Sequence, residues 1–275
     1  MQQELNDKLP IIRVIKNAYV DLFNKKKQYL IMSYLVTIPL FAVQYFFPVK
    51  VAYEQFSFAN VWINMIVSLP LLLLLGIFLL RLFMLGEKIQ FKITPSDLIN
   101  IFAKTFLYSI ALSLVIILVI LCVGFLFGLM LVIINSVAGE NATSGDVISG
   151  LITSAIMIFV LLTVFRTQPT FVSIALNQKT IPMKSAYYYT RDNNWNLILI
   201  GIACYAPIIV PTLLILLLNI GPLTSPTPLT MLLSFLLAPL NMMPYALHLS
   251  AGSQIYKYLV PYDEEGHNLK MDLPV

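Results

Sequence analysis

Two arginines, Arg81 and Arg166, are the residues of this chain best suited to binding chemistry, and they stand 85 residues apart. Each lies at the end of a long apolar run. A guanidinium at that depth can donate paired hydrogen bonds to a lipid phosphate. The alternative is that both side chains mark the end of a membrane span and extend to water. Further candidates for headgroup contact, from the basic and aromatic segment 181–196, are Lys184, Arg191 and Trp195.

Catalysis and metal binding find no support in the sequence. The two histidines, His248 and His267, lack the Ser and acidic partners of a hydrolytic triad, and His248 is expected to serve packing. The two cysteines, Cys122 and Cys204, lie in apolar runs without metal-binding or redox spacing. There is no glycine-rich phosphate loop and no soluble basic face. We therefore predict a protein that is not an enzyme, holds no metal or cofactor, and does not bind nucleic acid.

The hydrophobic segments decide where these residues lie. The chain is 59% hydrophobic and 11% charged, whereas soluble proteins carry about 25% charged residues, so lipid must be the solvent for much of it. A helix needs roughly 20 apolar residues to cross a bilayer. Six segments meet this length, at about 28–47, 61–85, 106–134, 147–165, 197–220 and 229–249.

The basic residues predict an orientation. Of the 17 Lys and Arg residues, all but Lys50 fall on one side of the plane that the six segments define. The positive-inside rule places that side, with both termini, in the cytoplasm. An even number of spans independently requires both termini on one side. The predicted location is the bacterial cytoplasmic (inner) membrane.

The chain also shows a repeat of about 86 residues. Pro10, Pro95 and Pro182 are spaced 85 and 87 apart, and each opens an amphipathic stretch that precedes two apolar segments. Proline suits the first position of a helix. The sequence from Thr94 to Asp97 reads as a variant of the capping box. Each amphipathic stretch is expected to lie at the cytoplasmic interface, the alternative being a plain extension of the next span.

The predicted fold is thus an all-α integral membrane protein of six transmembrane helices. They form three hairpin repeats, each preceded by a cytoplasmic interfacial amphipathic helix. A single membrane domain covers residues 1–260, with repeat units at about 10–94, 95–181 and 182–260. A polar cytoplasmic tail follows at 261–275.

Three residues at equal offsets are candidates for helix breaks. Pro39, Gly124 and Pro211 each stand 29 residues after the proline that opens their unit. Transporters use such breaks to line a cavity near the middle of the membrane. Kinks that serve packing explain the same residues equally well, since proline is common in membrane helices.

One stretch resembles a known pattern. Ser185, Ala186, Thr190, Arg191, Asn194 and Trp195, with Phe165, Arg166 and Pro169 upstream, are similar to a signature of uncharacterised bacterial six-span membrane proteins. The pattern is similar also to the membrane portion attached to some glycerophosphodiester phosphodiesterases, although no phosphodiesterase domain is present here. The resemblance implies a six-span fold and a membrane location, and no particular activity.

The function expected from the sequence is that of a non-catalytic inner-membrane protein. Its expected partners are membrane lipids or other membrane proteins, in the maintenance or assembly of the cell envelope. The absence of acidic residues deep within the apolar segments argues against proton or cation coupling. The alternative function is a permease for an apolar or amphipathic solute, built around the breaks at Pro39, Gly124 and Pro211.

Overall fold

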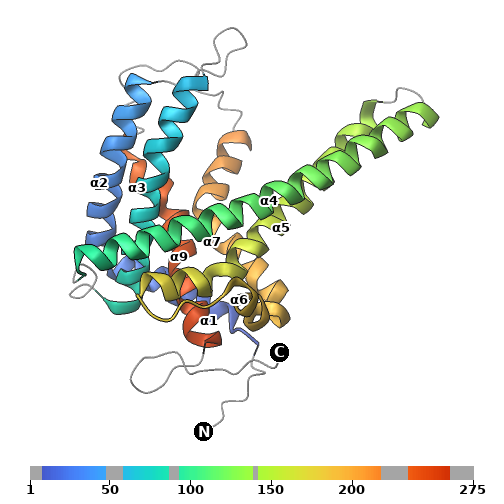
Figure 1. The fold of residues 1–275 in the computed structure, drawn as a ribbon. Helices are drawn as coiled ribbons and strands as arrows, with labels where there is room; N and C mark the ends of the chain where they lie inside the picture. The colour runs from blue at the N-terminus through green and yellow to red at the C-terminus, as the bar shows by residue number, and fades with distance from the viewer. Residues whose placement is uncertain (1–7, 48–57, 87–92, 139–141, 218–234, 261–275) are drawn as a thin grey trace.

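The computed structural model describes residues 8–47, 58–86, 93–138, 142–217 and 235–260, and every secondary-structure element in these ranges is helical (Figure 1). The elements in chain order are α1 (Ile11–Asn24), α2 (Lys26–Phe46), α3 (Phe58–Leu85), α4 (Pro95–Ala138), α5 (Ala142–Ala175), α6 (Met183–Thr190), the 3-10 helix η1 (Arg191–Asn193), α7 (Asn194–Leu217) and α9 (Ala238–Leu259). The all-α fold is confirmed for these ranges. The predicted tail, 261–275, lies outside the described residues.

Three of the described helices are long and apolar enough to cross a membrane. They are Ala59–Leu85, Pro95–Phe125 and Ile152–Ala175, and they overlap the second, third and fourth predicted spans. Helices α2, α7 and α9 overlap the first, fifth and sixth predicted spans. Part of the sixth, at 229–234, lies outside the described residues.

Helix α9 is the centre of the bundle. Helices α1, α2, α3, α5 and α7 all pack against it, and the whole run 246–256 is buried. Much of this run is small, including Ala251, Gly252 and Ser253, which allows neighbouring backbones to approach closely. The helix is less apolar than the predicted spans around it because much of its surface faces other helices.

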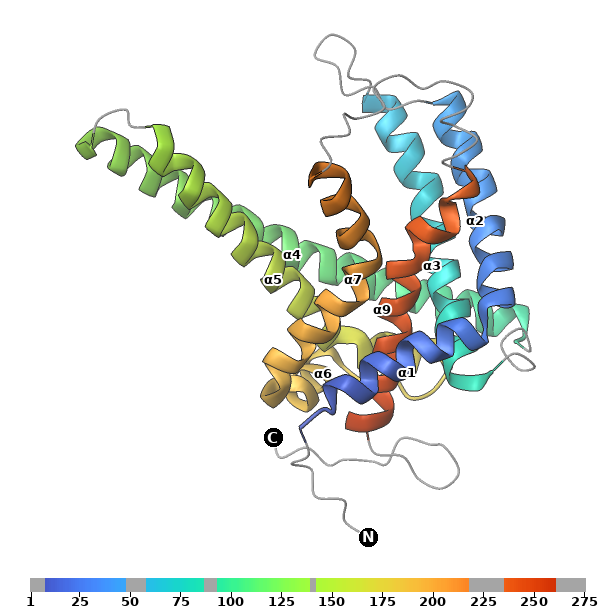
Figure 2. The same cartoon turned by 180° about the vertical axis from the view of Figure 1, so that it is seen from behind.

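Helix α1 forms where the amphipathic pattern predicts a helix, and part of its apolar face is buried in the protein, whereas Ile12, Val20 and Phe23 are exposed. Val14, Ala18 and Leu22 are 0–3% exposed, and the helix packs against α9 and α7 (Figure 2). Tyr19 on the same helix donates a hydrogen bond to the carbonyl oxygen of Ala203 in α7, at 2.8 Å. The amphipathicity of α1 therefore reflects, in part, packing within the protein.

The three repeated prolines all stand at helix starts, yet the helices that follow differ. Pro10 and Pro182 precede α1 and α6, while Pro95 is the first residue of α4. After Pro95 one helix of 44 residues runs without interruption through the predicted interfacial stretch and span. After Pro182 the first helix has only 8 residues and leads through η1 into α7. Separate opening helices thus exist in the first and third units and not in the second.

Helices α4 and α5 form a hairpin that extends away from the other helices (Figures 1 and 2). The most apolar 18-residue stretch of the candidate span in α4 has no buried residue, and the buried residues of this span, Ile101 and Thr105, lie near its start. Side chains such as Leu107, Leu114, Ile117 and Leu121 are exposed around the helix. We refer to this hairpin as the α4–α5 arm.

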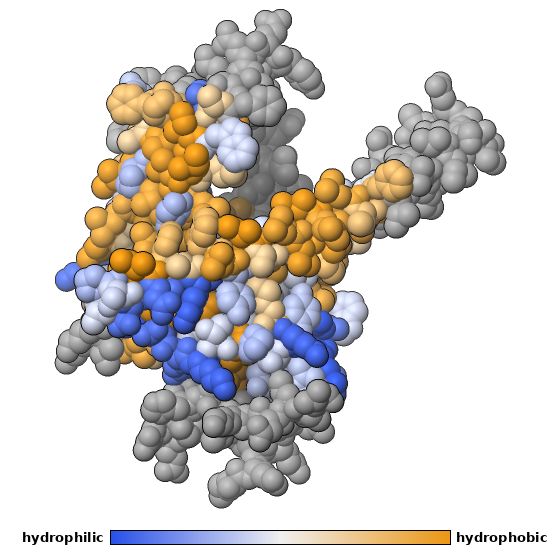
Figure 3. All heavy atoms as spheres, in the orientation of Figure 1, coloured by the Kyte–Doolittle hydropathy of each residue, from blue (hydrophilic) through white to orange (hydrophobic). Residues whose placement is uncertain are grey.

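The surface divides into an apolar and a polar part. Apolar side chains cover α2, α3 and the α4–α5 arm, and hydrophilic side chains gather at the end of the molecule where α1 and α6 lie (Figure 3). A second apolar cluster of Ile77, Ile101 and Ile174, each 1–2% exposed, joins α3, α4 and α5. The cluster fixes the base of the arm against the bundle.

Candidate functional site

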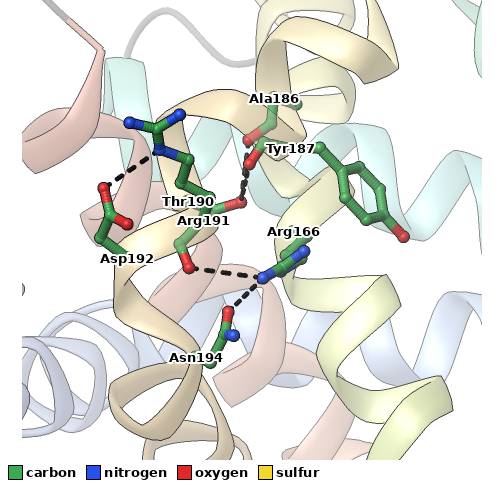
Figure 4. Close-up of polar contacts among 7 residues, drawn as sticks. All are labelled: Arg166, Ala186, Tyr187, Thr190, Arg191, Asp192 and Asn194. Atoms are coloured by element: carbon green, nitrogen blue, oxygen red, sulfur yellow. Dashed lines mark hydrogen bonds and ion pairs between the residues drawn. The ribbon is translucent and has the colours of Figure 1, made fainter.

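The candidate site is the corner where α6, η1 and α7 meet α5, which we call the α6–α7 corner. Arg166 extends from α5 into it (Figure 4). Its Nη2 donates a hydrogen bond to the carbonyl oxygen of Arg191 at 3.5 Å and another to Oδ1 of Asn194. Its guanidinium lies 5.2 Å from the centre of the Tyr187 ring. Arg166 therefore links α5 to the start of α7.

Arg166 was predicted to follow the fourth span, and that boundary is wrong. Helix α5 continues ten residues beyond Phe165, to Ala175. The apolar run ends at Phe165, but the helix does not. Its polar side chains are instead bonded within the bundle: Thr167 donates to the carbonyl oxygen of Thr163 at 3.1 Å, and Gln168 contacts α9.

Three residues of the corner present their side chains to the surroundings. Lys184 is exposed, the Trp195 residue is 77% exposed, and the Arg191 side chain is 60% exposed. Arg191 pairs with Asp192 at 3.3 Å and lies 4.7 Å from the centre of the Tyr188 ring. An ion pair this exposed contributes only about 0–1 kcal/mol, so a phosphate can replace Asp192 as its partner at little cost.

The neighbouring tyrosine, Tyr189, differs from Tyr188 in being half-buried. Burial raises the pKa of the Tyr189 phenol above its ordinary value. A tyrosine phenol is neutral at physiological pH even with its ordinary pKa of about 10, so Tyr189 adds no negative charge to the corner. The corner keeps its basic character for an anionic ligand.

Two asparagines join the N-terminal segment to this corner, a contact that the sequence did not reveal. Oδ1 of Asn193 accepts a hydrogen bond from the backbone N–H of Leu9 at 2.9 Å. Asn196 donates through Nδ2 to the carbonyl oxygen of Leu9 at 3.0 Å. Both backbone groups of Leu9 are thus satisfied by residues more than 180 positions away in the chain. In the sequence, the asparagines show only as part of a polar run before the fifth apolar segment, which does not indicate their partner.

Arg81 does not lie at the α6–α7 corner. It is 5% exposed and its Nη1 donates a hydrogen bond of 2.9 Å to the carbonyl oxygen of Ala175, the last residue of α5. The next residues form a helix-ending turn in which Asn177 and Gln178 donate to the carbonyls of Ile174 and Ser173. No backbone N–H of that turn donates to the carbonyl oxygen of Ala175, which instead accepts the hydrogen bond from Arg81. A cation at this position also suits the negative end of the helix dipole.

The start of α4 lies beside Arg81 and carries the predicted cap. The backbone N–H of Asp97 donates to Oγ1 of Thr94 at 3.2 Å, and Thr94 Oγ1 donates to Oδ2 of Asp97 at 2.7 Å. The capping-box variant is confirmed. It fixes both side chains at the N-terminus of the helix.

The three candidate break residues all lie inside helices that continue past them. Pro39 lies in α2, Gly124 in α4 and Pro211 in α7. No heavy atom lies within 4 Å of the position that a Cβ of Gly124 would occupy, so this glycine is not required by a close contact.

A buried polar pair, Gln168 and His248, joins α5 to α9, and sequence reasoning found only the histidine. Their Nε2 atoms are 2.6 Å apart, and both residues are at most 6% exposed. The His248 ring packs on Phe165 at 4.2 Å between ring centres. The predicted packing role of His248 agrees with this position.

No protein family, curated protein or solved structure matches this chain. Its class, a helical protein with apolar segments suited to a membrane, therefore comes from its own sequence and fold.

Proposed function

We propose that the chain is a non-catalytic six-span protein of a bacterial inner membrane that binds lipid headgroups with its cytoplasmic face. Both termini lie in the cytoplasm, and the three repeat units form the membrane domain. The protein acts in envelope maintenance or assembly, with membrane lipids and other membrane proteins as partners.

The observation that carries the proposal is the α6–α7 corner at the border of the apolar surface. Lys184, Arg191 and Trp195 are exposed there. The hydrophilic end of the molecule, where α6 lies, borders on the part of the surface that is rich in apolar side chains (Figure 3). Tryptophan prefers the headgroup level of a bilayer, and basic residues at that level attract anionic lipid. The three side chains together match an anionic lipid headgroup.

The two arginines first considered take a positioning role in this proposal. Arg81 and Arg166 bond backbone carbonyls at the ends of helical segments, Ala175 and Arg191 respectively. A guanidinium held in this way fixes the cytoplasmic ends of the helices. Contact with lipid falls mainly to the exposed residues of the corner.

The experiment compares lipid retention in two double variants of the whole protein. Lys184→Gln with Arg191→Gln removes two charges at the corner. Lys26→Gln with Lys27→Gln removes two exposed charges at the start of α2 and is the matched control. Each protein is reconstituted into nanodiscs that contain phosphatidylglycerol and phosphatidylcholine. Native mass spectrometry then measures the lipid that stays bound when the protein is released.

Basic residues near a membrane surface contribute about 1 kcal/mol each. The corner variant should therefore retain phosphatidylglycerol roughly 10- to 30-fold less tightly. The control should lose clearly less. Equal losses in both variants would mean that any exposed basic residue attracts the lipid and that the corner is no specific site. Unchanged retention in the corner variant would refute the headgroup site.

The permease alternative is predicted from the repeat and from the candidate helix breaks. It required breaks at Pro39, Gly124 and Pro211, and the helices continue through all three. It stays a prediction from sequence, without a feature of the described residues in its favour.

A further inference from the structure

The side of α1 that faces away from the bundle, which we call the α1 outer face, carries apolar and basic side chains together. Three large apolar side chains are exposed on it: Ile12 by 83%, Val20 by 44% and Phe23 by 58%. Two cations, Arg13 and Lys16, are exposed on the same side. At about 100° per residue, all of them lie within an arc of about 100° around the helix. Exposed apolar side chains that gather in this way mark an interaction surface.

Contacts on the opposite side of α1 fix which side faces outward. Val14, Ala18 and Leu22 are buried, and the helix packs against α9 and α7. Oγ of Ser250 in α9 donates a hydrogen bond to the carbonyl oxygen of Ala18 at 3.2 Å. A rotation of α1 about its axis would break these contacts, so the α1 outer face stays available to a partner.

The charges of α1 are divided between its two sides. The acidic residue of the helix, Asp21, is half-buried, and its Oδ2 accepts a hydrogen bond from Nε2 of Gln254 in α9 at 2.7 Å. The basic residues, Arg13 and Lys16, are exposed on the outer side. The charged groups of the α1 outer face are therefore positive, which is complementary to an anionic partner.

Both ends of α1 lie beside the starts of proposed spans. Leu9, just before the helix, is bonded through both backbone groups to Asn193 and Asn196 at the start of α7. The other end, Asn24, is followed closely by α2, which begins at Lys26. Figure 2 shows α1 running from the base of α7 to the base of α2. In the six-span arrangement proposed above, this is the level of the cytoplasmic headgroups.

We infer that the α1 outer face docks on the anionic surface of the cytoplasmic leaflet. Ile12, Val20 and Phe23 enter the boundary between headgroups and acyl chains, and Arg13 and Lys16 contact lipid phosphates. Helices with apolar and basic side chains bind membrane surfaces in this way. Lipid also surrounds a protein at this level of a bilayer, so no further component is needed to cover the face. The inference rests on the proposed membrane orientation and adds a surface separate from the α6–α7 corner.

The apolar contact is tested by measuring depth with spin labels. The full-length protein, with Cys122 and Cys204 replaced by Ala, carries one label at Ile12→Cys or at Phe23→Cys. Both side chains are exposed, so the labels leave the packing of α1 unchanged. The protein is placed in nanodiscs of phosphatidylglycerol and phosphatidylcholine. Collision of the label with oxygen, which enters lipid, is compared with collision with a nickel chelate, which stays in water.

Lys257→Cys is the reference position, because Lys257 is exposed in the last turn of α9, beyond the predicted end of the sixth span at 249. The ratio of oxygen to chelate collisions should be severalfold higher at Ile12→Cys and Phe23→Cys than at this reference. Equal ratios at the three positions would place the α1 outer face in water and refute the docking. Spectral broadening at Ile12→Cys that disappears on dilution with unlabelled protein would assign the face to a second copy and overturn the lipid assignment.

The charge contact is tested with two matched single variants of the full-length protein. Lys16→Gln should weaken the retention of phosphatidylglycerol in native mass spectrometry roughly fivefold, the effect of one basic residue near a membrane surface. Lys257→Gln removes an exposed lysine away from the face and should change retention clearly less. Equal changes in the two variants would overturn the anionic preference of the face.

This inference and the proposed headgroup site fail separately. Phosphatidylglycerol retention in the Lys184 and Arg191 variant reports on the α6–α7 corner. The depth of the labels at Ile12 and Phe23 reports on α1 while the corner is unchanged. Labels in lipid with no loss in the corner variant would leave only the α1 outer face standing, and the reverse would leave only the corner.

Discussion

Gly252 offers the sharpest test of how α5 packs on α9. A Cβ at this position would lie 2.6 Å from Oε1, 2.8 Å from Cδ and 3.0 Å from Cγ of Gln168. Ordinary carbon contacts are about 3.5–4.0 Å, so Gln168 must move by roughly half an ångström to one ångström. It is 4% exposed and its amide contacts His248, so that movement breaks a buried polar contact.

We expect Gly252→Ala to lower the free energy of unfolding by about 2 kcal/mol. Overpacking a core costs about 1–3 kcal/mol, and a disturbed buried hydrogen bond contributes to the same loss. The assay is equilibrium unfolding in mixed detergent micelles, followed by circular dichroism. Gly124→Ala is the control, because nothing lies within 4 Å of its Cβ position, and alanine there should be neutral or stabilising by up to about 1 kcal/mol.

The double variant decides whether Gln168 is the cause. In a Gln168→Ala background the side chain that meets the new methyl group is gone, so Gly252→Ala should cost less than about 0.5 kcal/mol. The coupling between the two substitutions should then exceed about 1 kcal/mol, as expected for residues in contact. An equal cost of Gly252→Ala in both backgrounds would refute the reasoning.

Three further predictions concern the N-terminal segment, a helix end and the topology. Asn193→Ala removes the acceptor of the Leu9 N–H and should cost about 1–2 kcal/mol, seen as faster hydrogen exchange at Leu9; unchanged exchange would contradict the contact. Asn177→Ala, at φ 56°, should cost about 1 kcal/mol in the unfolding assay, whereas Asn177→Gly should be neutral or better. With Cys122 and Cys204 replaced, a membrane-impermeant maleimide added from outside should label Asn60→Cys and not Lys27→Cys; labelling of both would contradict the predicted orientation.

Local chemistry explains which parts of the fold the sequence predicts. A cap depends on a few neighbouring residues, so Pro10, Pro182 and the Thr94–Asp97 pair could be assigned to helix starts from sequence. The end of α5 could not, because it depends on partners far along the chain. In the sequence, Gln168 is a polar residue just after an apolar run. Its partner His248 stands 80 residues later, so no local pattern shows that the two side chains are in contact.

In the candidate site, too, the features that depend on local sequence are predictable and the long-range contacts are not. The exposure of Lys184, Arg191 and Trp195 follows from their type and from the position of the apolar segments. The contact of Arg81 with Ala175 spans 94 residues, and no local pattern encodes it. The sequence predicts Arg81 at the lipid surface, whereas the structure has it buried and bonded to the end of α5.

The α4–α5 arm gives the molecule a wide outline, because it extends from the bundle on one side (Figures 1 and 2). The candidate span of α4 has 31 residues and is about 46 Å long, whereas the hydrocarbon core is about 30 Å thick. The helix is therefore about 16 Å longer than the core, and it either tilts or extends beyond the core at its polar start, where Asp97 and Lys104 stand. In a membrane, we expect a neighbouring protein on that side to meet the α4–α5 arm before it meets the bundle.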